Sequence, residues 1–164
     1  MIFGGLMPKV LQPKEMRKCL GCFTCMSACS TVNHKNHSLI KSAIKIRTSG
    51  GMSSGFLAII CFACKDPACM EVCPSHALEK RKGGGVLLTE EKCIGCRKCE
   101  NACIVHAVNF DQETQKPIIC HHCGLCAHYC PHDCLILVEA KEDIALTPAA
   151  VSAKLKDYDK PSQI

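Results

Sequence analysis

The sequence predicts an α+β fold built from short strands and short helices, and three observations support this prediction. Large core side chains are scarce, since the 164 residues include no Trp, two Tyr and five Phe. The chain contains 17 cysteines, most of them in four repeated groups, and short β-prone segments flank each group. An apolar core this small cannot hold the fold alone, so disulfides or bound metal must contribute.

The four cysteine groups have nearly the same spacing. In the first, third and fourth groups, successive cysteines are separated by two, two and three residues, and the second group has a middle gap longer by two. Three cysteines spaced in this way form a tight loop whose sulfur atoms converge, as in the loops that bind [4Fe–4S] clusters. The groups are Cys19, Cys22, Cys25 and Cys29; Cys61, Cys64, Cys69 and Cys73; Cys93, Cys96, Cys99 and Cys103; and Cys120, Cys123, Cys126 and Cys130.

The fourth cysteine of each group is predicted to lie at the start of a short helix and to point away from its own loop. In bacterial ferredoxin runs of this kind, the fourth cysteine binds the other cluster of a pair. Gly21 and Gly95 would let the backbone lie close to a cluster, where N–H groups can donate hydrogen bonds to sulfur.

Short strands are predicted on both sides of the groups. Segments that begin at His76, His106 and Cys134 follow the second, third and fourth groups. Strands this short cannot form a stable sheet unaided, so metal is expected to organise them. The segments Ile44–Thr48 and Phe56–Ile60 flank a Ser- and Gly-rich turn, and this pattern predicts a β-hairpin. The segments that precede groups are Lys9–Leu11, Phe56–Ile60, Gly85–Thr89 and Pro117–Ile119.

Disulfides and zinc are the alternative explanations for the cysteines. The cysteine count is odd and the first residues lack the pattern of a secretory signal, so a reducing cytoplasm is expected, where clustered cysteines bind metal. Structural zinc sites usually join two distant Cys-x2-Cys pairs, which would leave the third and fourth cysteines unexplained. The longest apolar run, Phe56–Ile60, is too short to span a bilayer.

The remaining composition indicates neither an enzyme nor a nucleic-acid-binding protein. The formal net charge is +5, but four clusters held by thiolates would add about −8, so that the sum is about −3. No catalytic residues are predicted. The eight histidines are expected to tune cluster potentials or face solvent. Cys134 aligns with Ala77 and Ala107 and is expected to be a small buried residue, the alternative being a ligand or reactive thiol.

The order of the groups, the "CMEVCP" that ends the second group and the "CIGCRKC" of the third resemble a known family. This family comprises the four-cluster iron–sulfur subunits of molybdenum and tungsten oxidoreductases, the dimethyl sulfoxide reductase type. The resemblance covers residues 9–139. It implies two bacterial-ferredoxin-like modules related by a pseudo-twofold axis. The module of groups two and three, about residues 56–110, would be nested in the module of groups one and four.

The resemblance also implies which cysteines share a cluster, whereas spacing alone leaves a nested and a sequential pairing open. The implied sets are Cys19, Cys22, Cys25 and Cys130 (cluster 1); Cys61, Cys64, Cys69 and Cys103 (cluster 2); Cys93, Cys96, Cys99 and Cys73 (cluster 3); and Cys120, Cys123, Cys126 and Cys29 (cluster 4).

The function that the resemblance implies is electron transfer without catalysis. Four [4Fe–4S] clusters would relay single electrons between a large tungsten or molybdenum subunit and a ferredoxin or NAD-reducing flavoprotein. The close spacing of Cys123 and Cys126, and Ile104 in place of proline, favour a compact cytoplasmic branch of anaerobic metabolism, most similar to the small subunit of tungsten aldehyde oxidoreductases. Alternatives are a carrier for carbon monoxide dehydrogenase, hydrogenase or benzoyl-CoA reductase, a free-standing polyferredoxin, and copies stacked end to end.

Residues 140–164 form a C-terminal tail of different composition. Thr147 is a candidate N-cap and Pro148 a candidate first helical residue. Val151, Leu155 and Tyr158 would then lie on one apolar stripe of a short helix. Such a stripe would dock either on its own subunit or on a partner.

Overall fold

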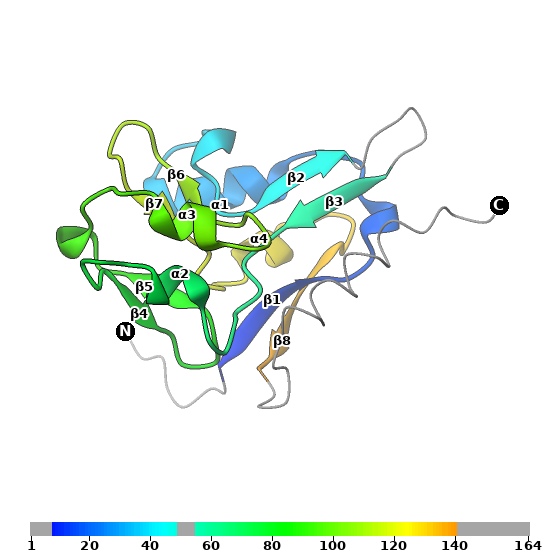
Figure 1. The fold of residues 1–164 in the computed structure, drawn as a ribbon. Helices are drawn as coiled ribbons and strands as arrows, with labels where there is room; N and C mark the ends of the chain where they lie inside the picture. The colour runs from blue at the N-terminus through cyan, green and yellow to red at the C-terminus, as the bar shows by residue number, and fades with distance from the viewer. Residues whose placement is uncertain (1–7, 49–54, 141–164) are drawn as a thin grey trace, which may run out of the picture.

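The computed structural model describes residues 8–48 and 55–140, and in these residues every sheet is a single antiparallel pair of strands (Figure 1). The first and last strands pair with each other, so that the two ends of the described chain run side by side. The pairs are β1 (Lys9–Pro13) with β8 (Leu135–Glu139), β2 (Lys45–Thr48) with β3 (Phe56–Ile59), β4 (Leu78–Lys80) with β5 (Val86–Leu88), and β6 (Asn109–Phe110) with β7 (Pro117–Ile118).

A short α-helix follows the second cysteine of each group. The helix of group one contacts the helix of group four, and the helices of groups two and three contact each other. The α+β class and the β2–β3 hairpin are therefore as predicted. The helices are α1 (Thr24–His34), α2 (Ala68–Glu71), α3 (Lys98–Ala102) and α4 (Leu125–His128), and the 3-10 turns are η1 (Met16–Lys18), η2 (Leu39–Lys41) and η3 (Glu90–Lys92).

The predicted helix start at the fourth cysteine was wrong. Every helix begins one residue before the third cysteine, and α2, α3 and α4 end before the fourth. In three groups the residue before the helix has a positive φ, which is 57° at Phe23, 59° at Arg97 and 82° at Gly124. This left-handed residue turns the chain sharply after the second cysteine, and the helix starts at once.

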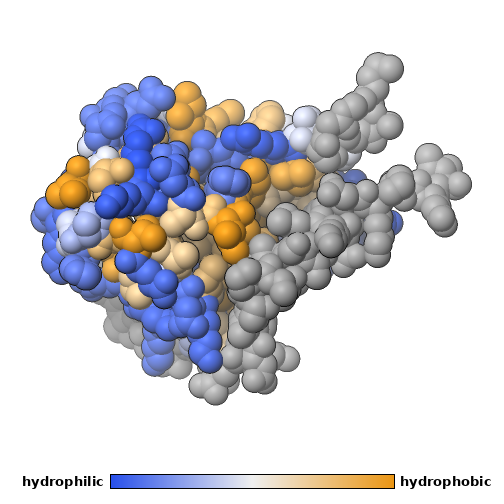
Figure 2. Space-filling model, in the orientation of Figure 1, coloured by the Kyte–Doolittle hydropathy of each residue, from blue (hydrophilic) through white to orange (hydrophobic). Residues whose placement is uncertain are grey.

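The apolar core is small, as the composition predicts, and cysteine thiols form part of it. One buried cluster of side chains includes Leu11, Ile44 and Ile60 together with several thiols, and a second surrounds Val86 and Phe110. Large apolar side chains also remain outside, and on the face shown in Figure 2 hydrophobic patches are interspersed among hydrophilic residues.

Two sequence predictions fall on residues that the structure leaves undescribed. The C-terminal helix expected from Thr147 and the turn at residues 49–54 both lie outside residues 8–48 and 55–140. Within those ranges, none of the helices has the length and hydrophobicity needed to span a bilayer.

Candidate iron–sulfur cluster sites

The four cysteine loops share one left-handed backbone position. The residue before the second cysteine has a positive φ in every loop, at 68° for Gly21, 51° for Ala63, 70° for Gly95 and 58° for His122. Glycine adopts this conformation at little cost, whereas Ala63 and His122 must be held in it by their surroundings. The four loops therefore turn alike just before the second cysteine although their side chains differ there.

In each group, the sulfur atom of the fourth cysteine accepts a hydrogen bond from a backbone N–H. In three groups the donor is the N–H of the residue four positions later, and each such donor follows a residue with positive φ. These N–H groups stabilise a thiolate. The hydrogen bonds to cluster sulfide expected near Gly21 and Gly95 stay a prediction. The N–H-to-Sγ distances are 3.4 Å from Ala77 to Cys73, 3.3 Å from Ala107 to Cys103, 3.4 Å from Cys134 to Cys130 and 3.4 Å from Ala43 to Cys29.

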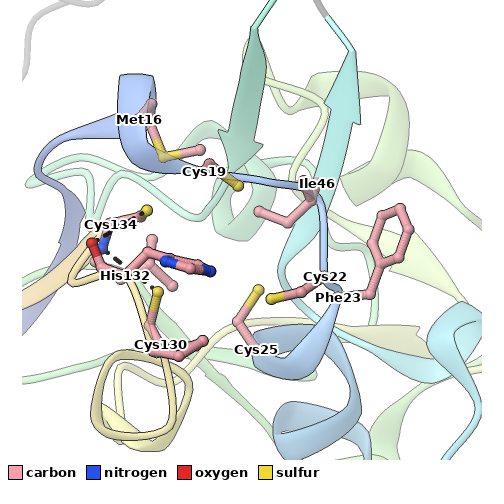
Figure 3. Close-up of a pocket in the computed structure, with 11 residues that line it drawn as sticks. Met16, Cys19, Cys22, Phe23, Cys25, Ile46, Cys130, His132 and Cys134 are labelled. Atoms are coloured by element: carbon pink, nitrogen blue, oxygen red, sulfur yellow. Dashed lines mark hydrogen bonds between the residues drawn. The ribbon is translucent and has the colours of Figure 1, made fainter.

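One cavity brings together thiols from the first and fourth groups. Cys19 and Cys22 line it from the loop before α1, Cys25 from the first turn of α1, and Cys130 from beyond α4 (Figure 3). Met16, Ile46 and Leu135 contribute apolar side chains to the lining. The cavity has an empty volume of about 330 Å³. We call these four cysteines set 1.

Two more cavities combine cysteines from different groups in the same manner, and their empty volumes are similar, at about 300 and 290 Å³. Each is lined by the first three cysteines of one group and the fourth cysteine of another. The cavities are lined by Cys120, Cys123, Cys126 and Cys29 (set 4), and by Cys93, Cys96, Cys99 and Cys73 (set 3).

The other four cysteines, Cys61, Cys64, Cys69 and Cys103 (set 2), also lie close together. Burial raises the pKa of Cys69 to about 12, and the nearby thiols of Cys61, Cys103 and Cys64 add to this increase. Burial likewise raises the pKa of Cys61 to about 11, with smaller contributions from Cys64 and Cys103. The structure thus brings together all four groupings that the resemblance implied.

Thiols also approach one another between sets, and these approaches define an order. Burial raises the pKa of Cys69, and a negative charge on the Cys99 thiol would raise it further. This effect links set 3 to set 2. A charge on the Cys61 thiol likewise raises the pKa of Cys120, which links set 2 to set 4. Cys25 acts on Cys126 and joins set 4 to set 1. The sets therefore follow one another in the order 3, 2, 4, 1.

Burial keeps several of these thiols protonated unless a cation binds them. It raises the pKa of Cys25 and of Cys120 to about 12, far above neutral pH. Metal-bound cysteine is a thiolate, so metal binding at these positions must release protons. In the described ranges, no three His, Cys, Asp or Glu side chains converge tightly enough to hold one metal ion.

Cys134 is buried, as predicted, and is 2% exposed where the aligned Ala77 and Ala107 are 1% and 2% exposed. Its thiol also lines the set 1 cavity (Figure 3).

We expect Cys134→Ala to retain all the iron and sulfide of the parent protein, because the N–H that bonds Cys130 is a backbone group. Iron and acid-labile sulfide analysis checks this, with Cys130→Ala as the control that loses a ligand. Loss of about a quarter of the iron in Cys134→Ala would identify Cys134 as a ligand.

His122 and Arg81 lie where set 2 meets set 4, a position that no local sequence pattern predicts. His122 is 4% exposed, and its Nδ1 accepts a hydrogen bond of 3.1 Å from the N–H of Leu11. Burial lowers its pKa to about 4, helped by the charge of Arg81, so the ring is neutral. The run of three glycines after Lys82 was the available signal, since it allows a very close approach of backbones.

The thiols of each set converge between short strand pairs, accept hydrogen bonds from backbone N–H groups and lie among apolar side chains. These features define an iron–sulfur protein of the ferredoxin type. Residues 52–139 match the 4Fe-4S dicluster domain family. The chain therefore belongs to this family and, within it, to the iron–sulfur subunits of the dimethyl sulfoxide reductase type.

Relatives with known roles support this membership. The chain is 35% identical over 103 residues to the arsenate respiratory reductase iron–sulfur subunit ArrB of Shewanella sp. (strain ANA-3), with 61% of this chain and 44% of that protein covered. It is 31% identical over 137 residues to YnfG, a probable anaerobic dimethyl sulfoxide reductase chain of Escherichia coli (strain K12), with 71% and 67% covered. It is 30% identical over 119 residues to a tetrathionate reductase subunit of Archaeoglobus fulgidus, with 71% and 55% covered. The chain thus spans from 44% to 67% of the length of these three relatives.

Proposed function

We propose that this chain is an electron-transfer subunit in which four [4Fe–4S] clusters relay single electrons between a catalytic molybdenum or tungsten subunit and a second redox partner. The observation that carries the proposal is the convergence of cysteines from two groups on each cavity, together with the contacts of α1 with α4 and of α2 with α3. The mutual effects of thiols on pKa link the sets in the order 3, 2, 4, 1. The names of the relatives, which are subunits of reductases and include an iron–sulfur subunit, support the same role.

The residues of each set fit a [4Fe–4S] cluster. Four thiols converge from two chain segments, and a backbone N–H is bonded to the fourth sulfur in every set. A bound cluster supplies one-electron redox chemistry without making or breaking a substrate bond. The protein binds it through thiolates, directs N–H groups at the sulfur atoms and limits the access of water with apolar side chains, which together set the potential.

The two terminal sets are the expected points of electron entry and exit. Cys22 of set 1 and Cys96 of set 3 are exposed. Leu20 and Ile94, at equivalent positions in these two loops, are 69% and 67% exposed. A partner that covers either side chain would bring its own redox centre close to a terminal cluster. Under this proposal, the catalytic subunit docks at one terminal set and a ferredoxin or an NAD-reducing flavoprotein at the other.

We assign the ligands of clusters 1 to 4 to sets 1 to 4, which gives two nested modules. The contact of α1 with α4 and of α2 with α3 supports this nested pairing. A sequential pairing would instead join group one with group two and group three with group four, whose helices are not among these pairs.

Double substitutions test the ligand assignment. If Cys61 and Cys103 hold the same cluster, Cys61→Ala with Cys103→Ala removes only one cluster and leaves about twelve irons per chain. Cys93→Ala with Cys103→Ala then removes two clusters and leaves about eight. Anaerobic iron analysis with EPR of the reduced proteins measures both values. Eight irons in the first variant would refute the nested pairing, because Cys61 and Cys103 would then hold different clusters. A sequential pairing leaves about eight irons in both variants, since Cys103 would share a cluster with neither Cys61 nor Cys93.

Anaerobic purification from the native host tests the role as a subunit. We expect the tagged chain to contain about sixteen irons and sixteen sulfides and to co-purify with a larger protein that contains molybdenum or tungsten. A chain with this iron content that elutes alone as a 17.8 kDa species would instead favour a free-standing polyferredoxin.

A further inference from the structure

The two middle sets meet beside one cation, Arg81, which lies at the end of β4 in the turn to β5. Cys61 of set 2 and Cys120 of set 4 both lie close enough to the guanidinium to affect its pKa. The turn that carries Arg81 lies at the boundary between the sets, since a Cβ atom at Gly85 would be 3.7 Å from Cys61 Sγ and 3.5 Å from His122 Nε2. The backbone N–H of His122 in turn bonds Cys120 Sγ at 3.4 Å. Arg81 therefore occupies the step at which an electron would pass from one proposed module to the other.

Hydrogen bonds hold the Arg81 guanidinium in place from both modules. Its Nη2 donates to the carbonyl of Lys9 in β1 at 2.6 Å, and its Nη1 donates to the carbonyl of Gly84 in its own turn at 3.1 Å. Both acceptors are neutral backbone groups. The side chain is thus fixed without any cancellation of its charge.

The positive charge of Arg81 is uncompensated in the part of the chain that the structure describes. There, the ion pairs of Lys and Arg side chains with carboxylates leave out Arg81. Burial lowers its pKa and the thiols of Cys120 and Cys61 oppose that effect, but an arginine remains protonated in proteins. Its natural counter-charges are the thiolates and clusters on either side.

Arg81 is only partly exposed and is held at this position by its two hydrogen bonds. The neighbouring Lys82 has the same formal charge, but its side chain is exposed and therefore screened by water.

The charge has a definite consequence for electron flow. Reduction adds one negative charge to a cluster, and burial makes that addition harder. Set 2 has no exposed thiol and three of the four thiols of set 4 are buried, whereas sets 1 and 3 each have one exposed thiol and one buried thiol. Without compensation, the middle of the relay would be harder to reduce than its ends. A fixed cation between the two middle clusters opposes this effect.

We propose that Arg81 raises the reduction potentials of clusters 2 and 4 together and so removes an uphill step from the middle of the relay. This inference rests on the proposed four-cluster function. In the step concerned, one electron leaves cluster 2 as cluster 4 gains it, or the reverse. No bond or proton is transferred, and Arg81 itself is unchanged.

EPR-monitored reductive titration of the anaerobic holoprotein tests the role of Arg81. Variants that lack single ligands assign each midpoint to its cluster. In Arg81→Gln we expect the equilibrium constants for reduction of clusters 2 and 4 to fall about tenfold. This corresponds to a decrease of about 59 mV in each midpoint potential for one electron. Clusters 1 and 3 should keep their midpoints. Arg81→Lys retains the charge and should recover most of the shift, and Lys82→Gln is the matched exposed control that should change none.

A second pair of variants keeps the test decisive if Arg81→Gln does not load its clusters. His121→Glu would place a carboxylate beside Arg81 and neutralise its charge without removing its hydrogen bonds, and His121→Gln is the neutral control. We expect His121→Glu to lower the midpoint of cluster 2 as well as that of cluster 4, although His121 belongs to the set 4 loop.

Three results would overturn the inference: unchanged midpoints in Arg81→Gln, an equal shift of all four clusters, or a shift in Lys82→Gln as large as in Arg81→Gln. A change confined to cluster 4 in His121→Glu would also overturn it. Iron and sulfide analysis separates these failures from failure of the proposed function, which would appear as fewer than four clusters in the parent protein.

Discussion

Removal of iron is expected to unfold the whole chain. Anaerobic treatment of the purified protein with a chelator should abolish the far-UV circular dichroism of its strands and helices along with its visible absorption. The loss should be one cooperative event, because the thiols that would lose their metal lie inside both buried clusters of side chains.

The size of the remaining core explains this expectation. The largest side chains with less than 2% exposure are Ile44, Ile60 and Val86, and isolated two-stranded sheets are marginal in water. A domain is stable by only about 5–15 kcal/mol in total, and one structural zinc site can contribute about 10–16 kcal/mol. Loss of metal from four sites of comparable strength therefore exceeds anything that this core can replace.

Circular dichroism and size-exclusion chromatography before and after chelation measure the outcome. Reconstitution with iron and sulfide under reducing conditions is the control, and it should restore both the absorption and the compact elution volume. A metal-free chain that still elutes as a compact species and melts cooperatively would show that apolar packing alone specifies the fold.

The sequence was sufficient to predict the strands and the hairpin, because the pattern that indicates them repeats. The sharing of cysteines between groups followed only from the family resemblance, since spacing alone leaves a nested and a sequential pairing open. The segments after Cys73, Cys103 and Cys130 align residue by residue. The buried position of Cys134 followed from that alignment. The start of the helices was missed, since it depends on a left-handed residue after the second cysteine, and Phe23 and Arg97 give no sign of that conformation in sequence.

The junction between the middle sets could not be predicted for a different reason. Arg81 reaches the carbonyl of Lys9, which lies 72 positions away in the chain, and no local pattern encodes such a contact. The run of three glycines, Gly83 to Gly85, indicates a turn in the sequence but not what that turn packs against. Its packing against the Cys61 loop depends on a backbone approach that emerges only in the folded chain.

Gly84→Ala is expected to have the second largest effect, because Gly84 permits that approach. Its φ is +93°, and a Cβ atom there would lie 2.1 Å from the carbonyl oxygen of Ala63 and 2.9 Å from its carbonyl carbon. The clash is with backbone, so no side-chain rotation can relieve it. With the cost of the left-handed conformation included, we expect a destabilisation of roughly 3 kcal/mol or more.

The position of the clash determines which cluster should suffer first. Ala63 lies between Cys61 and Cys64, and the next residue of the turn, Gly85, donates its N–H to the carbonyl of Cys64 at 3.1 Å. Displacement of this loop should release cluster 2 before the others. Displacement of the Gly84 carbonyl should also loosen Arg81 and lower the midpoint of cluster 4 in molecules that keep all their iron.

Thermal melting under anaerobic conditions and the rate of iron release to a chelator measure both effects. Gly55→Ala is the matched control, because a Cβ at Gly55 meets nothing within 4 Å, and we expect it to change stability by less than about 0.5 kcal/mol. Gly84→Ala could instead melt at the same temperature as Gly55→Ala and release iron from all clusters at the same rate. In that case the contact between the glycine turn and the Cys61 loop cannot be what positions set 2. The charge of Arg81 would then lack a fixed place from which to act on two clusters.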